Sequence, residues 1–342
     1  MSGPQQPGGL PRVGVRIAGT GSCLPERKLT NADLVAMMET SDEWIVQRTG
    51  IRERRISDHE GRESTGKLAA ESLRRALAAA HMSAKDLDLI IVSTMTPEMS
   101  CPPTACLVAA QVGAGNCGAF DINGACCGFV FGLNTAHALV ASGAYRNVAL
   151  IGADTLTHLM DYSDAGRSTA IIFGDAAGCA LLRATDDTSK GIIAQSMHSD
   201  GQGWKEIYVP CKPYHFPEGT PVDERKYGRV QMNGSAVFKF AVHTFSNLID
   251  ETLQKARLKP SDIDLYICHQ SNQRILHAAR DRFGLPEDKL YINIDRVGNT
   301  VAASVPLCLD EVVRARGLPE GAKVLFVAFG GGLTWGSSLW QL

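Results

Sequence analysis

Residues 83–93 read SAKDLDLIIVS and residues 260–269 read PSDIDLYICH, so one pattern occurs twice in the chain, about 176 residues apart. Each copy is a polar turn followed by a short, almost wholly apolar run, which predicts a buried strand. The same separation relates NVALIGAD (147–154) to KVLFVAFG (323–330), and both are again strand-like. Buried strands of this kind, alternating with helix-like segments, are typical of α/β layers with helices on both faces.

A third pair of segments supports the repeat. DINGACCGFVFGL (121–133) can be set against DRVGNTVAASVPL (295–307) at an offset two residues shorter, which aligns Asp121 with Asp295. Three segments in the same order argue for an ancestral duplication. Two halves related by a pseudo-twofold axis would bring the ends of equivalent strands together at one central site.

The length of 342 residues accommodates such a duplicated fold with a sizeable core. We expect a first half over residues 13–185, a second half over residues 186–342, and a mobile tail over residues 1–12. The tail sequence MSGPQQPGGLPR lacks the charged start and apolar middle of a signal peptide.

The composition is that of an ordinary soluble globular protein, with 44% hydrophobic residues, 20% charged residues and a formal net charge of -2. Nothing in it favours binding to nucleic acid or to a membrane surface, and the cytoplasm is the expected location. The ten cysteines include no CxxC pair and no Cys/His cluster at zinc-ligand spacing. A metal site is therefore not expected, and most of these cysteines should behave as small hydrophobic residues.

Two adjacent cysteines, Cys126 and Cys127, stand at the start of the apolar run GFVFGLNTAHALV, which predicts a buried helix. A free thiol has a pKa of about 8.5, and the N–H groups and dipole of a helix N-terminus stabilise its anion. One of the pair is therefore a candidate nucleophile. The alternative is that both are packing residues, because free cysteine is often buried.

Three further features lie at the ends of predicted strands or in turns. His269 ends the run DLYICH, at the end of a strand where α/β folds place ligands, although a lone histidine is more often a core residue. Asn299 follows a glycine and is either a turn residue or part of the same site. The glycines at 330–332 follow another predicted strand, and their N–H groups can approach a ligand closely unless they form a simple hairpin turn.

Six motifs together resemble those of one family. They are TSDEWIVQRTGIRERRI (40–56), DINGACCGF (121–129), IIFGDAAG (171–178), HQSNQRI (269–275), DRVGNTVAASVP (295–306) and AFGGGLTWGS (328–337). In this order, and over nearly the whole chain, they resemble β-ketoacyl-acyl-carrier-protein synthase III, the condensing enzyme that initiates type II fatty-acid synthesis. The resemblance implies the duplicated five-layer αβαβα fold of thiolase-like enzymes, in agreement with the internal repeat.

The resemblance also implies the catalytic residues. The cysteine of the D-x-x-x-x-C block, Cys126, would be the nucleophile, with His269 and Asn299 as its catalytic partners. Cys127 takes a position often held by a small residue such as alanine, which fits a packing role. The oxyanion hole would consist of the backbone N–H groups of Cys126 and Gly331.

The implied reaction transfers an acyl group from acyl-CoA to the cysteine and then condenses it with malonyl-acyl-carrier protein, with loss of CO2. No metal or redox cofactor is required, and the family forms homodimers. The residues implied to bind CoA are Trp44, Arg48, Arg167, Gly234, Phe238 and Asn272. The residues implied to bind the acidic carrier protein are Lys239, Arg274 and Arg282. Ordinary solvent-exposed side chains would look the same in the sequence.

Cys101 departs from the family pattern. Its position corresponds to a residue that crosses the dimer interface and closes the partner's acyl pocket, frequently as phenylalanine or threonine. A smaller side chain there predicts a deeper pocket and tolerance of primers that are branched or longer than acetyl.

Other members of the same superfamily are the alternative interpretations of this sequence. A degradative thiolase needs a second cysteine in its glycine-rich block, and GGGLTWG contains none. Hydroxymethylglutaryl-CoA synthase needs a catalytic glutamate, for which Glu98 is the one candidate near a strand end. An acyltransferase, or a ketosynthase of secondary metabolism that uses a non-acetyl primer, remains the strongest alternative. A non-catalytic partner subunit is disfavoured, because such relatives lose the nucleophile that Cys126 provides.

Overall fold

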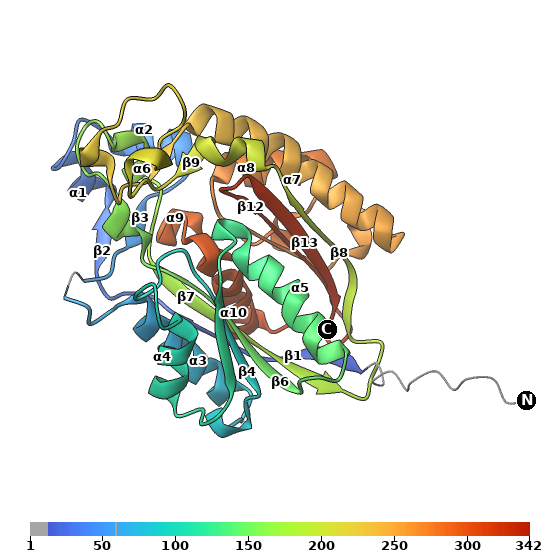
Figure 1. Cartoon of the computed structure of the whole chain (residues 1–342). Coiled ribbons are helices and arrows are strands. Elements are labelled where there is room, and N and C mark those ends of the chain that lie inside the picture. The colour runs from blue at the N-terminus through green and yellow to red at the C-terminus, as the bar shows by residue number, and fades with distance from the viewer. Residues whose placement is uncertain (1–12, 59) are drawn as a thin grey trace, which may run out of the picture.

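Two β-sheets carry the fold (Figure 1), and the computed structural model describes residues 13–58 and 60–342. The predicted tail at residues 1–12 lies outside the described residues. The first sheet has the order β1-β7-β6-β4-β5, with bounds Gly14–Cys23 (β1), Leu89–Ser93 (β4), Gly118–Ile122 (β5), Asn147–Asp154 (β6) and Ala176–Thr185 (β7). The second has the order β11-β12-β13-β8, with bounds Gly191–Ser199 (β8), Leu265–Cys268 (β11), Lys323–Gly330 (β12) and Thr334–Gln341 (β13).

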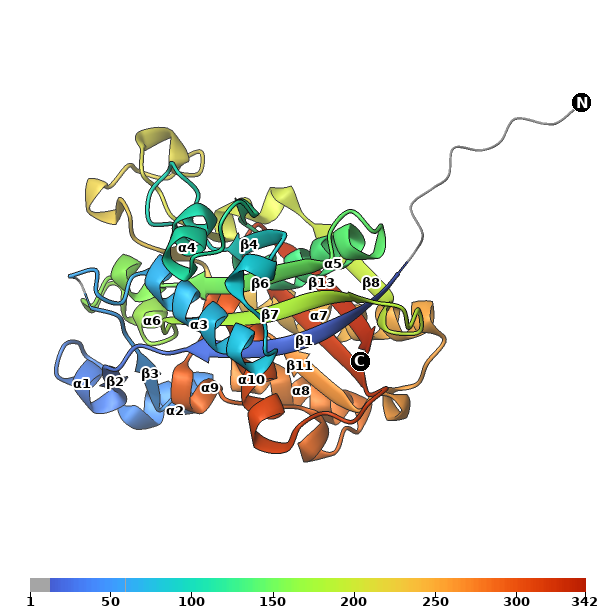
Figure 2. The same cartoon turned by 90° about the horizontal axis from the view of Figure 1, so that it is seen from below.

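Helices cover both faces of each sheet. Figure 2 shows α3 (Thr65–Ala79) and α4 (Thr104–Val112) on the outer face of the first sheet. Helices α7 (Gly234–Ala256) and α8 (Gln273–Phe283) cover the outer face of the second sheet. Between the two sheets lie α5 (Gly128–Ala141) and α10 (Ser304–Arg316). The predicted duplicated five-layer αβαβα fold is therefore confirmed.

The largest apolar cluster fills the middle layer. It joins Leu133 of α5 and Leu309 of α10 to Leu150 of β6 and Phe326 of β12, all of them buried. Helix α5 is apolar on nearly every side because it has a sheet on each side of it. Burial on both faces also explains why the strands β4, β6 and β12 are almost continuous apolar runs, as parallel strands of this kind usually are.

The repeat is visible in the backbone. Strand β4 corresponds to β11, β6 corresponds to β12, and α5 corresponds to α10, each at an offset of 176 residues. Before each middle helix the chain makes a short 3-10 turn, Ala125–Cys127 in the first half and Val301–Ala303 in the second. The first residue of each turn has a positive φ, 45° at Ala125 and 52° at Val301.

The predicted alignment of residues 121–133 with residues 295–307 was therefore two residues out of register. The turns set the correspondence, which is 176 residues here as elsewhere, and they match Asn123 with Asn299. Each asparagine uses its Oδ1 atom in the same way, accepting from the N–H of Ala125 at 3.2 Å in one half and from that of Val301 at 2.9 Å in the other. The residue types suggested the wrong register because strand β5 of the first half is replaced by the short helix α9 (Ile294–Val297) in the second.

One pair of equivalent positions differs in character. Asp154 ends β6 and is fully buried, and its Oδ2 atom accepts a hydrogen bond from the N–H of Ala302 at 3.1 Å. The equivalent of Asp154 at the end of β12 is Gly330, and the equivalent of Ala302 is Cys126. A side chain at Gly330 would collide with this cysteine, because a Cβ atom there would lie 2.7 Å from the Cys126 Cβ atom.

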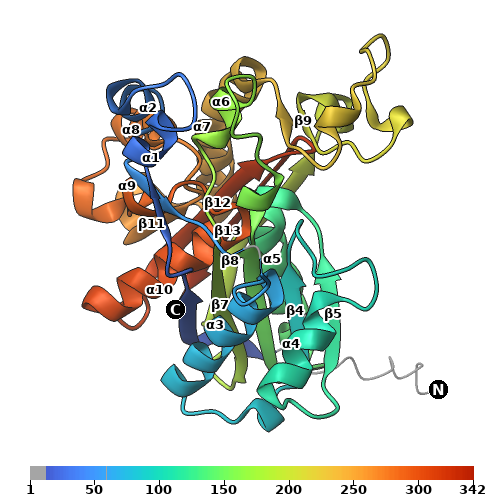
Figure 3. The same cartoon turned by 90° about the vertical axis from the view of Figure 1, so that its left-hand side faces the viewer.

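Two segments outside the layers border one end of the molecule. The cap, which we define as residues 24–58, contains the hairpin of β2 (Lys28–Thr30) and β3 (Glu53–Arg55) and the helices α1 (Asn31–Val35) and α2 (Asp42–Thr49). Figure 3 shows α2 beside α8 of the second half. The remaining short elements are α6 (Arg167–Ala170) and the two-stranded sheet of β9 (Ile207–Tyr208) and β10 (Gln231–Met232).

Candidate active site

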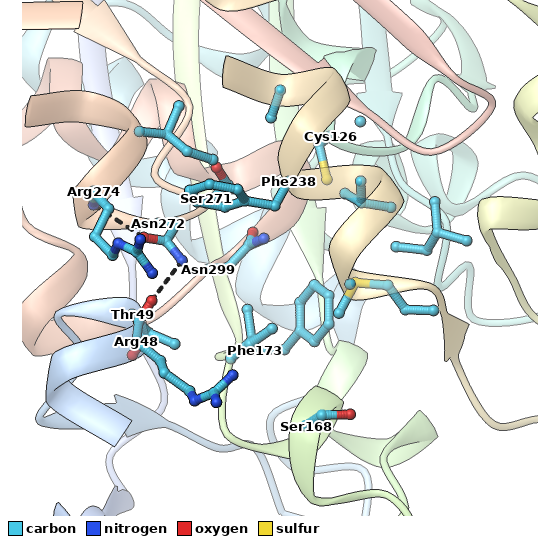
Figure 4. Close-up of a pocket in the computed structure, with 18 of the residues that line it drawn as sticks. Arg48, Thr49, Cys126, Ser168, Phe173, Phe238, Ser271, Asn272, Arg274 and Asn299 are labelled. Atoms are coloured by element: carbon cyan, nitrogen blue, oxygen red, sulfur yellow. Dashed lines mark hydrogen bonds between the residues drawn. The ribbon is translucent and has the colours of Figure 1, made fainter. Parts of the chain in front are cut away.

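A cavity of about 550 Å³ opens between the cap and the second half, and Figure 4 shows the side chains that point into it. Its walls come from both halves of the repeat. Cys126, His269 and Asn299 all line it, together with Gly330 and Gly331. The sequence predicted a shared central site for these residues, and the fold brings them to one cavity.

Cys126 lies in the 3-10 turn that leads into α5, and only 8% of its surface is exposed. The backbone N–H groups of Cys126 and Gly331 both face the thiol and lower its pKa, but burial has the larger effect and raises the pKa to about 12. The predicted stabilisation of the thiolate by the helix start is therefore outweighed in the ligand-free protein.

Cys127 is fully buried and packs into the apolar cluster of the middle layer, next to Phe129 and Leu133. Burial raises the pKa of its thiol. Cys127 does not line the cavity, in keeping with the predicted packing role.

His269 follows β11 directly, and its backbone N–H continues the strand pairing by donating to Val327 O at 2.8 Å. The ring is 1% exposed and packs edge-on against Phe329, with 5.6 Å between ring centroids. Burial lowers the pKa of His269 to about 3, so the imidazole is neutral at physiological pH. Its Nδ1 atom is buried and has no hydrogen-bond partner among the described residues.

Asn299 is held in place by hydrogen bonds of its backbone and of its side-chain oxygen. Its N–H donates to Ile172 O at 2.9 Å, and its carbonyl accepts from the N–H of Gly174 at 3.0 Å. Because the side-chain oxygen already accepts from Val301, the NH2 group is the part that is left to donate into the cavity. The left-handed turn residue is the preceding Gly298, with φ 68°, and not Asn299 itself.

The entrance on the cap side is formed by α2. The side chain of Ser41 caps this helix by accepting from the N–H of Trp44 at 3.1 Å. The guanidinium carbon of Arg48 lies 4.6 Å from the centre of the Trp44 ring and that of Arg167 lies 5.0 Å from it. Arg167 also donates to Glu39 O, and it does not itself line the cavity.

The opposite wall is formed by α7 and by the start of α8, and it contributes Gly234, Phe238, Lys239, Asn272 and Arg274 to the cavity. The side chain of Asn272 caps α8 and donates from Nδ2 to Arg48 O at 2.9 Å, which links this wall to the cap. The guanidinium carbon of Arg274 lies 5.1 Å from the centre of the Phe238 ring.

The structure does not bring Arg282 to this entrance. It lies eight residues beyond Arg274 on α8, which is about 12 Å along the helix axis. It also forms an ion pair with Asp250 of α7, with 2.6 Å between Nη2 and Oδ2.

Cys101 and Glu98 lie in the loop between β4 and α4, away from the cavity of this chain. Cys101 is exposed. The Oε1 atom of Glu98 accepts from the N–H of Gly66 at 2.6 Å, at the start of α3, so this carboxylate has a structural contact. Neither side chain lines the cavity.

Several apolar residues of the wall were not predicted from the sequence. Ile171, Ile172 and Phe173 line the cavity from the segment after α6, and Ile207 and Met232 line it from β9 and β10. The first three belong to the IIFGDAAG motif, for which the sequence predicted no role.

In residues 13–58 and 60–342 no group of three or more His, Cys, Asp or Glu side chains is placed to hold a metal ion. Within the same ranges no helix combines the length and the apolar character needed to cross a membrane.

Two family models match the chain. The model described as 3-oxoacyl-[acyl-carrier-protein (ACP)] synthase III matches residues 120–201, and the model of its C-terminal part matches residues 253–342. Beta-ketoacyl-[acyl-carrier-protein] synthase III of Caldanaerobacter subterraneus subsp. tengcongensis is 46% identical over 328 residues, which cover 96% of this chain and 98% of that protein.

Solved structures agree with this result. The β-ketoacyl-[acyl-carrier-protein] synthase III of Thermus thermophilus superposes with a TM-score of 0.88 at 41% identity, covering 95% of this chain and 98% of that one. The priming β-ketosynthase from the R1128 polyketide biosynthetic pathway has a TM-score of 0.88 at 32% identity, covering 100% and 99% of the two chains.

Proposed function

The chain belongs to the 3-oxoacyl-[acyl-carrier-protein] synthase III family, and from this membership we infer that it catalyses the condensation that initiates fatty-acid synthesis. The reaction joins an acyl-CoA primer to malonyl-acyl-carrier protein and releases CoA and CO2. We assign the chemistry to Cys126, His269 and Asn299. The observation that supports this assignment is that one cavity holds a buried thiol, a neutral imidazole and a carboxamide with a free NH2 group.

In the first half-reaction the Cys126 sulfur attacks the thioester carbonyl of acyl-CoA. The thiol proton passes to the neutral imidazole of His269, which has one ring nitrogen available as an acceptor. The oxyanion that forms is stabilised by the N–H groups of Cys126 and Gly331. When it collapses, the C–S bond to CoA breaks, the proton is returned to the CoA thiolate, and the acyl group remains on Cys126.

In the second half-reaction malonyl-acyl-carrier protein replaces CoA. Loss of CO2 leaves its electron pair on the carbon next to the thioester, and negative charge accumulates on the thioester oxygen. For this step His269 carries its proton on the ring nitrogen that faces the cavity, which is the other tautomer from the one that accepts the thiol proton. This N–H and the NH2 group of Asn299 donate to the oxygen. The carbanion then attacks the acyl-Cys126 carbonyl, and 3-oxoacyl-carrier protein forms as the Cys126 sulfur leaves as a thiolate. This thiolate takes up a proton from water, which restores the thiol.

A burst assay tests the proposed function. Mixing the protein with acyl-CoA alone should release about one CoA per chain and leave an acyl group on Cys126. Addition of malonyl-acyl-carrier protein should then release CO2 and form the 3-oxo product. A protein that releases no CoA would fit a non-catalytic subunit, and one that is acylated but never releases CO2 would fit an acyltransferase.

The rate of decarboxylation should be nearly independent of pH across the neutral range. The pKa of His269 lies at about 3, so the imidazole that donates to the enolate is already neutral at pH 5 and stays neutral as the pH rises. We expect a flat profile between about pH 5.5 and 8.5, whereas an ordinary histidine would titrate at about 6.5. CO2 release from malonyl-acyl-carrier protein measures the profile, and a rise with a midpoint near the ordinary value would contradict the assignment.

The entrance is suited to CoA. We propose that Trp44 stacks on the adenine with Arg167 on its other face, while Arg48, Gly234, Phe238 and Asn272 border the pantetheine arm. Because Arg167 now lies against the Trp44 ring, it has to move aside to admit the base. Arg48 and Arg274 also line an adjoining hollow of about 490 Å³, where their positive charges favour phosphate groups.

Replacement of Trp44 by alanine should therefore raise KM for acyl-CoA and leave kcat nearly unchanged. Stacking of a base on an aromatic ring contributes about 1–3 kcal/mol, so an increase in KM on the order of 10-fold or more is expected. Steady-state kinetics with varied acyl-CoA provide the measurement. Tyr214→Ala, which removes an aromatic ring that is 73% exposed, is the matched control and should change neither constant.

We propose that the carrier protein docks on the α7–α8 side of the entrance, where Lys239 and Arg274 line the cavity. Its acidic surface would be attracted by these charges. Arg282 was predicted to join this patch, but its ion pair with Asp250 reduces the charge it can offer. The protein is proposed to act in the cytoplasm as a homodimer, and the proposed reaction uses no metal or redox cofactor.

The exposed Cys101 is proposed to reach the acyl pocket of the partner subunit, where its small side chain leaves room for longer or branched primers. Cys101→Phe should narrow the selectivity towards acetyl-CoA, by at least about 10-fold in the ratio of kcat/KM values for a branched primer and acetyl-CoA. Sharp restriction of the unmodified protein to acetyl-CoA would contradict this proposal.

A further inference from the structure

One arginine of the WIVQRTGIRERR motif, Arg54, is buried where no substrate can reach it. Arg54 lies in β3, its exposed fraction is 0%, and it does not line the cavity. Burial lowers the pKa of its guanidinium to about 10, so the group still carries its charge at neutral pH. Among the residues that the structure describes, no ion pair includes Arg54.

The guanidinium joins three segments through backbone and amide oxygens. Its Nη1 atom donates to Leu29 O at 3.2 Å and to Asn31 Oδ1 at 2.9 Å, and its Nη2 atom donates to Ile171 O at 2.7 Å. Burying a charge costs several kcal/mol. This cost is offset here by hydrogen bonds, because the planar guanidinium fork can donate to three separate acceptors. Lysine has no such fork and cannot reach all three at once.

One arm of this network leads to the CoA entrance. Asn31 accepts from Arg54 and donates through Nδ2 to Asp42 Oδ1 at 2.7 Å. Asp42 is the first residue of α2, the helix that presents Trp44 and Arg48 to the cavity.

The other arm leads to Asn299. Ile171 begins the segment whose next residue, Ile172, accepts the backbone N–H of Asn299, and whose Gly174 donates to the Asn299 carbonyl. The two segments form a parallel β-bridge between Phe173 and Asn299.

Arg54 also fills the space next to this bridge. A Cβ atom on Gly174 would lie 3.1 Å from the Arg54 Cβ atom, and one on Gly298 would lie 3.2 Å from it. The arginine therefore lies against the glycine on each strand of the bridge that holds Asn299.

We propose that Arg54 is a positioning residue that holds the carboxamide of Asn299 in place for decarboxylation and ties it to the helix that binds acyl-CoA. The proposal rests on the role assigned to Asn299 under the proposed function. Misplacement of a reacting group by about 1 Å can cost on the order of 10²-fold in rate, so loss of the fork should be visible in kinetics before it is visible in the fold.

Arg54→Lys tests the arm that leads to Asn299. It should lower the rate of CO2 release from malonyl-acyl-carrier protein by about 10–100-fold. The burst of CoA from acyl-CoA at saturation should change by less than about threefold, because Cys126, Gly331 and the oxyanion hole are untouched. A purely structural role would lower both half-reactions together, in proportion to the folded fraction.

Arg55→Lys is the matched control. Arg55 is the next residue of β3 and also donates to two cap carbonyls, Pro25 O at 2.9 Å and Glu26 O at 3.1 Å, but it has no contact with Ile171. It should preserve the ratio of the two half-reactions. If Arg54→Lys gives the same ratio as Arg55→Lys, the proposal is overturned.

Asn31→Ser tests the other arm and does not depend on the stability of an Arg54 variant. It removes the contacts of the Asn31 side chain to Asp42, Ile51 O and Arg54, while the bond from Arg54 to Ile171 O remains. KM for acyl-CoA should therefore rise severalfold with the rate of CO2 release retained. An unchanged KM would refute this arm. Failure of the unmodified protein to release CO2 would instead refute the proposed function, which keeps the two failures apart.

Discussion

Replacement of Cys126 by alanine is expected to abolish formation of the acyl-enzyme. In the proposed mechanism the acyl group is bonded to this sulfur, and no other thiol lines the cavity in the described part of the chain. Loss of a nucleophile that acts as one unit with its base costs on the order of 10⁴–10⁶-fold in rate. Mass spectrometry of the intact protein after mixing with acyl-CoA, together with the burst of CoA, measures the loss.

Cys127→Ala provides the control for this experiment. Cys127 is the adjacent residue, but it is packed in the middle layer. The variant should still be acylated, with a loss limited to what a small cavity in the core costs in stability. An acylated Cys126→Ala protein would remove the basis of the proposed mechanism.

Replacement of Asn299 by alanine is expected to separate the two half-reactions. In the proposed mechanism the carboxamide NH2 is one of two donors to the enolate oxygen, and loss of one preorganised donor costs about 10²–10³-fold. Release of CO2 should therefore fall by this factor, while the burst of CoA should persist because Asn299 makes no contact in the first step. Parallel measurement of CO2 and CoA on the same preparation tests the separation.

The alanine variant also removes the contact from Asn299 Oδ1 to the N–H of Val301, which supports the turn before α10. Asn299→Asp keeps an oxygen at this position and replaces only the donor. It should lose decarboxylation as fully as the alanine variant does. An aspartate variant that decarboxylates at the normal rate would show that the asparagine holds the turn and does not contact the enolate.

The sequence was sufficient to predict the layers, and it predicted that Cys126, His269 and Asn299 share one site, as their common cavity shows, because these predictions rest on strong local signals. Runs such as LIIVS and VLFVAF can only be buried on both faces, and His269 stands directly at the end of one of them. These runs predicted how strands and helices alternate along the chain, and the motifs alone indicated the family.

Properties that depend on the surroundings of a residue were not predictable in the same way. The raised pKa of Cys126 arises from burial by several segments distant in sequence, and the pairing of Arg282 with Asp250 joins two helices. The error in register had a similar origin, since neither the replacement of β5 by α9 nor the positive φ at Ala125 and Val301 has a signature in residue type. In the sequence nothing separates Arg54 from the other charged residues of its motif, and the hydrogen bond from its guanidinium to Ile171 O is visible only in the structure.

The contrast between Asp154 and Gly330 explains why a fold with two equivalent halves has a single centre of reaction. In one half the amide of Ala302 donates to the side chain of Asp154, which belongs to the protein itself. In the other half the equivalent amide, that of Cys126, faces a residue without a side chain, and in the proposed mechanism it is left to donate to the oxyanion of the substrate. The two halves therefore differ in what their equivalent amides bind, and Asp154→Gly would leave both amides facing a glycine.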